Sequence, residues 1–176
     1  MKFKKFMIAL LRFILKPLSF IPALLMMYTI FSFSAQDGAT SSNLSYSVSY
    51  KAISIADRAL DLELTDKQIS RCIRKIHVYV RKIAHFTEYL LLAITITFPL
   101  YVYGIRGIWL VISGGILCIG FAALDELHQY FVSGRSCSVR DVVIDSCGSL
   151  IGILTVRFFG YIGRKTIFEP LSKHRS

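Results

Sequence analysis

Four long runs of apolar residues divide the chain, and they constrain its fold more than any other feature. They cover about residues 17–33, 83–103, 107–124 and 142–159. Each run is about long enough to cross ~30 Å of hydrocarbon as a helix that rises about 1.5 Å per residue. Because a backbone in hydrocarbon has to satisfy its own hydrogen bonds, each run is expected to be helical. The sequence therefore predicts an all-α membrane protein, a four-transmembrane-helix bundle.

The predicted bundle forms one small domain that takes up most of the chain. We expect it over residues 17–163, with spans at about 17–34, 83–103, 107–127 and 141–160. A basic N-terminal segment (1–16) precedes the domain, and a basic C-terminal tail (164–176) follows it. Apolar residues make up 54% of the sequence, which is more than most soluble domains of this size contain.

Charges near the first run bear on how the chain is inserted. A cleaved signal peptide would also begin with basic residues, but Phe33 is bulky where cleavage requires a small residue. Basic residues are divided almost equally between the two sides of the bilayer, so the positive-inside rule favours a cytoplasmic amino terminus only slightly. An even number of spans then puts both termini in the cytoplasm. We expect a multi-pass protein of the cell membrane.

The formal net charge of +10 could indicate a nucleic-acid partner. No nucleic-acid motif accompanies this charge, and the basic residues flank the apolar runs. Contact with lipid headgroups explains them more simply. The expected partner is therefore membrane lipid and not nucleic acid, while the oligomeric state stays open.

A further helix is predicted just before the second run. Thr65 and Gln68 have the spacing of a capping box, which marks a helix start. From Ile69 to Ile83 apolar residues recur on one stripe, with basic residues opposite. The pattern predicts an amphipathic interfacial helix on the headgroups before the second span. A merely solvated basic face is the alternative.

Ionisable residues occur at the ends of the predicted spans. The second span begins with such a group, the third ends with one and the fourth begins with one. Antiparallel crossings bring all three groups to the same membrane side, whichever way the protein is inserted. Since a charge at mid-bilayer costs ~2.5–3.5 kcal/mol, these residues need partners or water. The candidate ligand-binding residues are Arg81, Lys82, His85, Glu88, Asp125, Glu126, Gln129, Arg135, Asp141 and Asp145.

A pair of glycines in the fourth run is expected to tighten this cluster. Gly148 and Gly152 form a small-xxx-small face that lets another helix approach closely. The approach would carry Asp141 and Asp145 toward the other polar groups. No residue spacing requires a metal, and neither a metal nor another cofactor is expected.

Three interpretations of the cluster stay open. In the first, Arg81, Lys82 and Arg135 bind a phosphate or carboxylate on the headgroup of an amphiphile, in a polar cavity at the outer membrane face. In the second, the protein is an intramembrane enzyme for a lipid-linked substrate, with His85 as acid or base and Glu88 or Asp145 orienting it. In the third, the cluster is a structural network of ion pairs.

The same residues carry a resemblance to a known family. Residues 81–89 and 125–131 resemble motifs of the VanZ-like family, as do Gly134, Arg135, Asp141, Asp145 and Gly148 after them. Residues 33–36 resemble the end of that family's first span, and the match covers about residues 20–160. The resemblance implies a small bacterial membrane protein of a family whose founding member lowers susceptibility to teicoplanin. It thus implies a role in glycopeptide resistance or the cell envelope, with a lipid-linked cell-wall precursor or a glycopeptide as partner.

Overall fold

The computed structural model describes residue 7 and residues 16–164, and these residues are mostly helical and contain no strand. The helices are α2 (Ile21–Ser34), α3 (Gly38–Leu60), α4 (Asp66–Val102), α5 (Gly107–Tyr130) and α6 (Val139–Gly163). The predicted all-α fold is confirmed. Apart from residues 7, 16 and 164, the predicted basic segments 1–16 and 164–176 lie outside the described residues.

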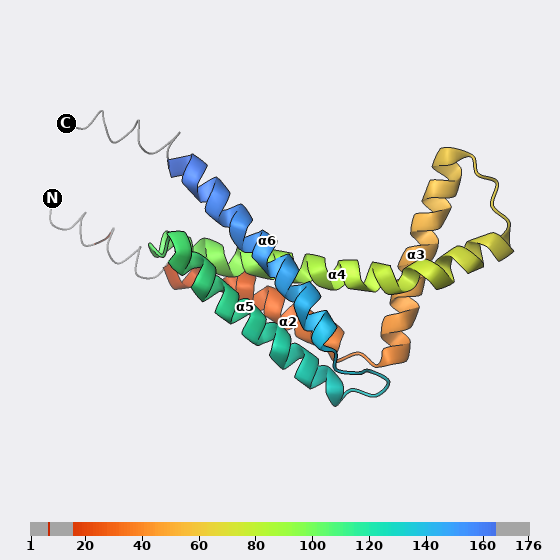
Figure 1. Ribbon diagram of the computed structural model, residues 1–176, viewed down its shortest axis with the longest axis horizontal. Helices are drawn as coiled ribbons and strands as arrows, with labels where there is room; N and C mark the ends of the chain where they lie inside the picture. The colour runs from red at the N-terminus through yellow and green to blue at the C-terminus, as the bar shows by residue number, and fades with distance from the viewer. Residues whose placement is uncertain (1–6, 8–15, 165–176) are drawn as a thin grey trace.

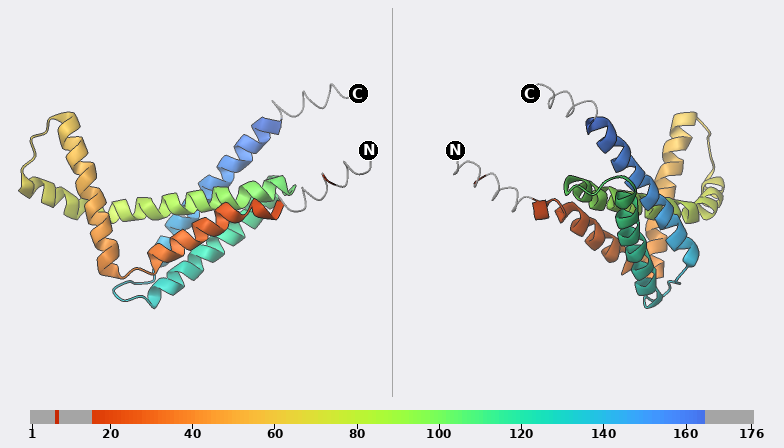
Figure 2. Two further views of the ribbon diagram at one scale, coloured as in Figure 1. Left: turned by 180° about the vertical axis from the view of Figure 1, so that it is seen from behind. Right: turned by 60° about the vertical axis from the view of Figure 1, so that its left-hand side comes forward.

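Four helical stretches in the described residues are long and apolar enough to cross a membrane. They are Lys16–Ser34, Asp66–Val102, Gly107–Tyr130 and Val139–Gly163. Helices α2, α4, α5 and α6 lie together as a bundle, and α3 leaves it at one end (Figures 1 and 2). The predicted number of spans is confirmed. The start of α2 and the end of α6 lie at the same end of the bundle (Figure 1).

The tightest packing in the bundle is between α4 and α6, which contact each other more extensively than any other pair of helices in the described chain. A Cβ on Gly148 would collide with the backbone carbonyl oxygen of Phe86, and one on Gly152 with that of Leu90. Tyr89 and Ile153 are buried in the core beside this contact. The prediction that the two glycines allow a close helix approach is confirmed.

Helix α4 is much longer than one membrane crossing. Its 37 residues extend for about 55 Å, whereas the hydrocarbon takes about 20 residues. The predicted start is confirmed, because the capping box is present and the Thr65 N–H donates to Gln68 Oε1 at 2.8 Å. The predicted amphipathic helix is the first half of α4. It continues into the span without a break because no Gly or Pro occurs between Asp66 and Pro99.

Helix α3 was not predicted from the sequence. Its N-cap is Asp37, whose side chain accepts a hydrogen bond from the Thr40 N–H at 2.7 Å. It packs against α4 and buries the side chains of Ser45 and Ser49. Each of these hydroxyls donates to the carbonyl four residues earlier, which satisfies it without a partner on another helix. The helix therefore needs no long apolar run, and that is why hydropathy did not indicate it.

Candidate functional site

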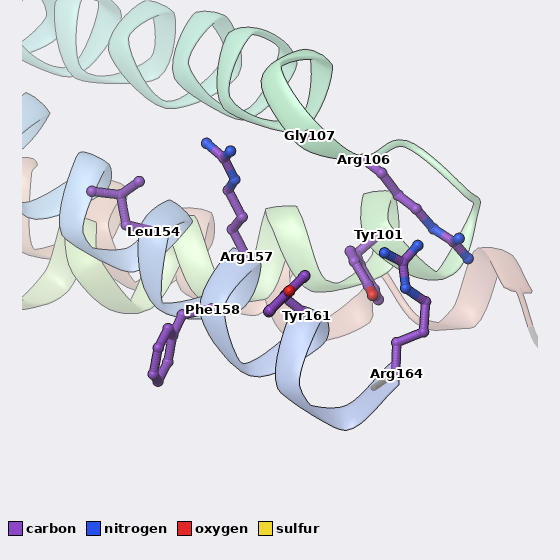
Figure 3. Close-up of a pocket in the computed structure, with 8 residues that line it drawn as sticks. All are labelled: Tyr101, Arg106, Gly107, Leu154, Arg157, Phe158, Tyr161 and Arg164. Carbon is purple, nitrogen blue, oxygen red and sulfur yellow. The ribbon is translucent and has the colours of Figure 1, made fainter. Parts of the chain in front are cut away.

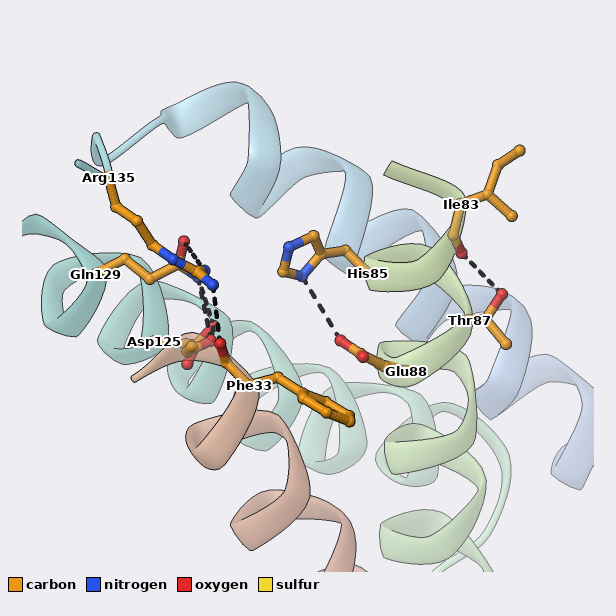
Figure 4. Close-up of polar contacts among 9 residues, drawn as sticks. Phe33, Ile83, His85, Thr87, Glu88, Asp125, Gln129 and Arg135 are labelled. Atoms are coloured by element: carbon orange, nitrogen blue, oxygen red, sulfur yellow. Dashed lines mark hydrogen bonds and ion pairs between the residues drawn. The ribbon is translucent and has the colours of Figure 1, made fainter. Parts of the chain in front are cut away.

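The polar residues of three helices meet at one end of the bundle. They come from the middle of α4, the end of α5, the loop 131–138 and the start of α6. Figure 4 shows those of α4, α5 and the loop. The α2–α3 connection joins them, since the N–H of Gly38, at the start of α3, donates to the Ser133 carbonyl at 3.0 Å. The site thus lies where the α2–α3 and α5–α6 connections touch.

A buried hydrogen-bond network forms one part of the site. The Asp125 carboxylate accepts hydrogen bonds through one oxygen from Ser34 Oγ at 2.8 Å and from Gln129 Nε2 at 3.0 Å. These three side chains are almost fully buried. Gln129 Oε1 in turn accepts a hydrogen bond from Arg135 Nη1 at 3.0 Å (Figure 4). The network joins α2 to α5 and to the loop that follows.

Arg135 is fixed by backbone carbonyls at the end of α2. Its Nε donates to the Gln36 carbonyl and its Nη2 to the Phe33 carbonyl, both at 2.8 Å. A cation at a helix C-terminus is stabilised by the helix dipole and by the free carbonyls there. Burial lowers the pKa of Arg135, and the positive charge of Arg81 lowers it further. The guanidinium nevertheless stays protonated at neutral pH, and all its named bonds are to the protein.

Two further contacts hold the start of α6. Glu126 is buried, and its Oε2 accepts a hydrogen bond from the Ser138 N–H at 2.8 Å. An acid at this position satisfies a free donor at the helix N-terminus. Lys82 Nζ forms an ion pair with Asp141 Oδ1 at 2.7 Å, which links α4 to α6. The approach of Asp141 to the polar residues of α4 follows from the glycine contact described above.

Two cavities border this part of α4. The first has a volume of about 230 Å³ and is lined by residues of α2, α3, α4 and two connections, among them Gln36, Ser41, Ser45 and Glu88. The second has a volume of about 200 Å³ and is bordered by α4, the 131–138 loop and α6. Both cavities are lined by Arg81, His85 and Arg135.

The cavities separate the predicted site residues into two groups. The residues that line a cavity are Arg81, Lys82, His85, Glu88, Arg135, Asp141 and Asp145. Asp125, Glu126 and Gln129 line neither cavity, because their side chains are used in the contacts that fix the helix ends. Sequence reasoning missed Ser34, which binds Asp125, and Ser41 and Ser45 of α3, which line the first cavity.

Several polar groups that face the cavities have no hydrogen-bond partner within the described residues. The half-buried Arg81 guanidinium makes no hydrogen bond or ion pair there. His85 Nδ1 is buried without a hydrogen bond and lies 3.6 Å from Glu88 Oε2 (Figure 4). Asp145 Oδ1 is likewise buried and unpaired. Because unsatisfied buried polar groups are costly, these are the groups that a ligand or water would satisfy.

The described residues offer no ready metal site at this end. They contain no group of three or more His, Cys, Asp and Glu side chains arranged to hold an ion. The arrangement presents to a ligand the Arg81 guanidinium, a histidine ring nitrogen that makes no hydrogen bond, and carboxylates that line each cavity. Such a site can bind an anion and can hold a proton donor or acceptor beside it.

These features define a class: a multi-pass helical membrane protein with a polar cluster at one end of its bundle. The profile of the VanZ/LLP1 family matches residues 19–160. The chain belongs to this family, and the resemblance noted in the sequence is confirmed. No curated protein and no solved structure matches the chain.

Proposed function

We propose that this VanZ/LLP1-family protein binds the anionic headgroup of an amphiphile in the two cavities, at the outer face of the cell membrane. The ligand is a lipid or a lipid-linked cell-wall precursor, and binding it serves glycopeptide resistance or another cell-envelope process. The observation that supports this most is Arg81, which is half-buried, lines both cavities and makes no hydrogen bond or ion pair within the described residues.

Arg81 suits this role better than the neighbouring cations. Lys82 is paired with Asp141, and Arg135 is bound to Phe33, Gln36 and Gln129. A guanidinium presents a planar fork of donors that fits phosphate and carboxylate oxygens. Glu88 and Asp145 line one cavity each and would accept hydrogen bonds from hydroxyl or amino groups of the same headgroup.

The size and place of the cavities agree with a headgroup ligand. Volumes of about 230 and 200 Å³ admit a phosphate with a small polar group, but not the acyl chains of a lipid. The chains would stay in the bilayer beside α4 and α2. With the amino terminus inside, this end of the bundle faces outward, where the substrates of cell-wall synthesis are exposed.

Native mass spectrometry of the detergent-purified protein tests the proposal. We expect wild type to retain a specific anionic amphiphile and Arg81→Gln to lose it, with affinity reduced about tenfold or more, because a charge-assisted bond contributes about 1.5–3 kcal/mol. Arg74→Gln is the matched control, since Arg74 is exposed on α4 about two turns earlier. If the two variants and wild type carry only the same bulk lipid, the proposal is wrong and the cluster is structural.

A second candidate function is an intramembrane enzyme acting on a lipid-linked substrate. It is favoured by His85, which borders both cavities and whose buried Nδ1 makes no hydrogen bond and lies 3.6 Å from Glu88 Oε2. His85 would transfer a proton, with Glu88 orienting the ring. Prolonged incubation should then change the mass of the bound species in wild type, while His85→Gln binds it unchanged. If both proteins convert the bound species equally, or if neither converts it, the enzyme hypothesis is wrong.

A further inference from the structure

The end of the bundle opposite the polar site carries a second group of cations. Arg106 precedes α5, and Arg157 and Arg164 lie near the end of α6. Together with Tyr101 and Tyr161 they line a cavity of about 520 Å³ (Figure 3). None of these residues belongs to the site described above, and the length of the bundle separates the two.

These arginines have no acidic partner in the part of the chain that forms this end. Residues 16–34, 89–124 and 146–164 contain no Asp or Glu. Arg106 lies over the ring of Tyr101, 5.5 Å from its centroid, which is a weak substitute for an anion. Arg157 is exposed six residues before the end of α6, about 9 Å along the helix. A charge at that depth requires an anion or water.

An apolar groove continues from this cationic cavity. A cavity of about 650 Å³ shares Tyr101, Arg106 and Arg164 with it and extends between α4 and α6. Apart from these shared residues, its lining is mostly apolar and includes Phe98 and Phe159, both exposed at the surface of the bundle. The surface thus has a positively charged head region and a long apolar region beside it.

We propose that this surface binds an anionic glycerophospholipid. The phosphate lies among Arg106, Arg157 and Arg164, and one acyl chain occupies the groove between α4 and α6. Charge complementarity selects the headgroup, because three cations meet no protein carboxylate in the described chain here. A zwitterionic lipid would fill the groove equally well but would bring a positive group to the arginines. The bound lipid would fasten α4 to the end of α6.

The position of the only tryptophan makes this site testable apart from the polar one. Trp109 is exposed in the first turn of α5, two residues after Gly107, which lines the cationic cavity. Phosphatidylglycerol with brominated acyl chains quenches tryptophan that it contacts. In bilayers of phosphatidylcholine, brominated phosphatidylglycerol should quench Trp109 more than brominated phosphatidylcholine does at the same mole fraction.

Substitution of single arginines completes the test. Arg157→Gln and Arg164→Gln should each reduce the preference for phosphatidylglycerol about fivefold, the effect of one basic residue at an anionic surface. Arg140→Gln should not, because Arg140 is exposed at the other end of α6. Equal quenching by both lipids in wild type would overturn the proposal. An unchanged lipid preference in both arginine variants would also overturn it. So would loss of the preference in millimolar phosphate but not in chloride of the same ionic strength.

Discussion

Gly148 of α6 lies directly against the backbone carbonyl of Phe86 in α4, one residue after His85. A side chain could not be accommodated there by a rotamer change, because the atom in the way belongs to the backbone. The contact therefore sets the separation of the two helices that supply Lys82, Asp141 and Asp145.

The first prediction is that Gly148→Ala destabilises the protein by about 1–3 kcal/mol, the usual cost of overpacking. The added Cβ should push α6 away from α4 and enlarge the second cavity. Thermal unfolding in detergent measures the effect. Gly120→Ala is the control, because nothing lies within 4 Å of a Cβ at that position of α5. Equal melting temperatures for Gly148→Ala and wild type would contradict the close contact.

Arg135 is predicted to be a structural residue more than a ligand-binding one. Arg135→Lys should destabilise the protein by about 2–3 kcal/mol, because an ammonium cannot reach Phe33, Gln36 and Gln129 together, as the guanidinium does. The 131–138 loop should also become accessible to protease. Thermal unfolding and limited proteolysis measure both effects, with the exposed Arg140→Lys as control. Full stability of Arg135→Lys would show that charge alone is required.

The sequence was sufficient to predict the number of spans and the end at which the polar residues gather. Apolar runs have to become helices in hydrocarbon, and alternating crossings decide which ends meet. The Gly148 contact was predictable too, because its small-xxx-small spacing falls on the face that carries Asp145.

The contacts that each polar residue makes could not be predicted from the sequence. Arg81 and Arg135 are alike in type, yet Arg135 is occupied by the end of α2 and Arg81 is unpaired in the described residues. The difference arises from the contact of two loops far apart in the sequence. Helix α3 was missed because its buried serines hydrogen-bond within their own helix and leave no apolar signal.

Variants of the Lys82–Asp141 ion pair can distinguish a structural role of these two residues from a role in ligand binding. Both side chains are about one-third exposed, at 32% and 34%, so the pair should contribute only about 0.2–1 kcal/mol to stability. A double-mutant cycle with Lys82→Ala and Asp141→Ala measures this coupling by thermal unfolding. The exchanged pair, Lys82→Asp with Asp141→Lys, should recover the stability. If the exchanged pair is stable but loses the anionic amphiphile, Lys82 or Asp141 also contacts the ligand.

The last prediction concerns acid and the start of α3. The Thr40 N–H and then the Thr40 hydroxyl hold the pKa of Asp37 below its usual value. A lowered pKa in the folded state means that the cap is fully present above the unfolded pKa of about 3.9. It is lost as the pH falls through the folded pKa. Below the folded pKa of Asp37, backbone amides in the first turn of α3 should therefore exchange faster relative to their intrinsic rates.

Hydrogen–deuterium exchange over residues 38–45, read by mass spectrometry, measures this loss. Asp37→Asn provides the control, because an asparagine caps a helix about as well as an aspartate but does not titrate. Its exchange protection should be independent of pH, whereas that of wild type should fall in acid. Since Ser41 and Ser45 of this helix line the first cavity, acid should also weaken ligand binding in wild type more than in Asp37→Asn. The same acid response in both proteins would assign it to another group.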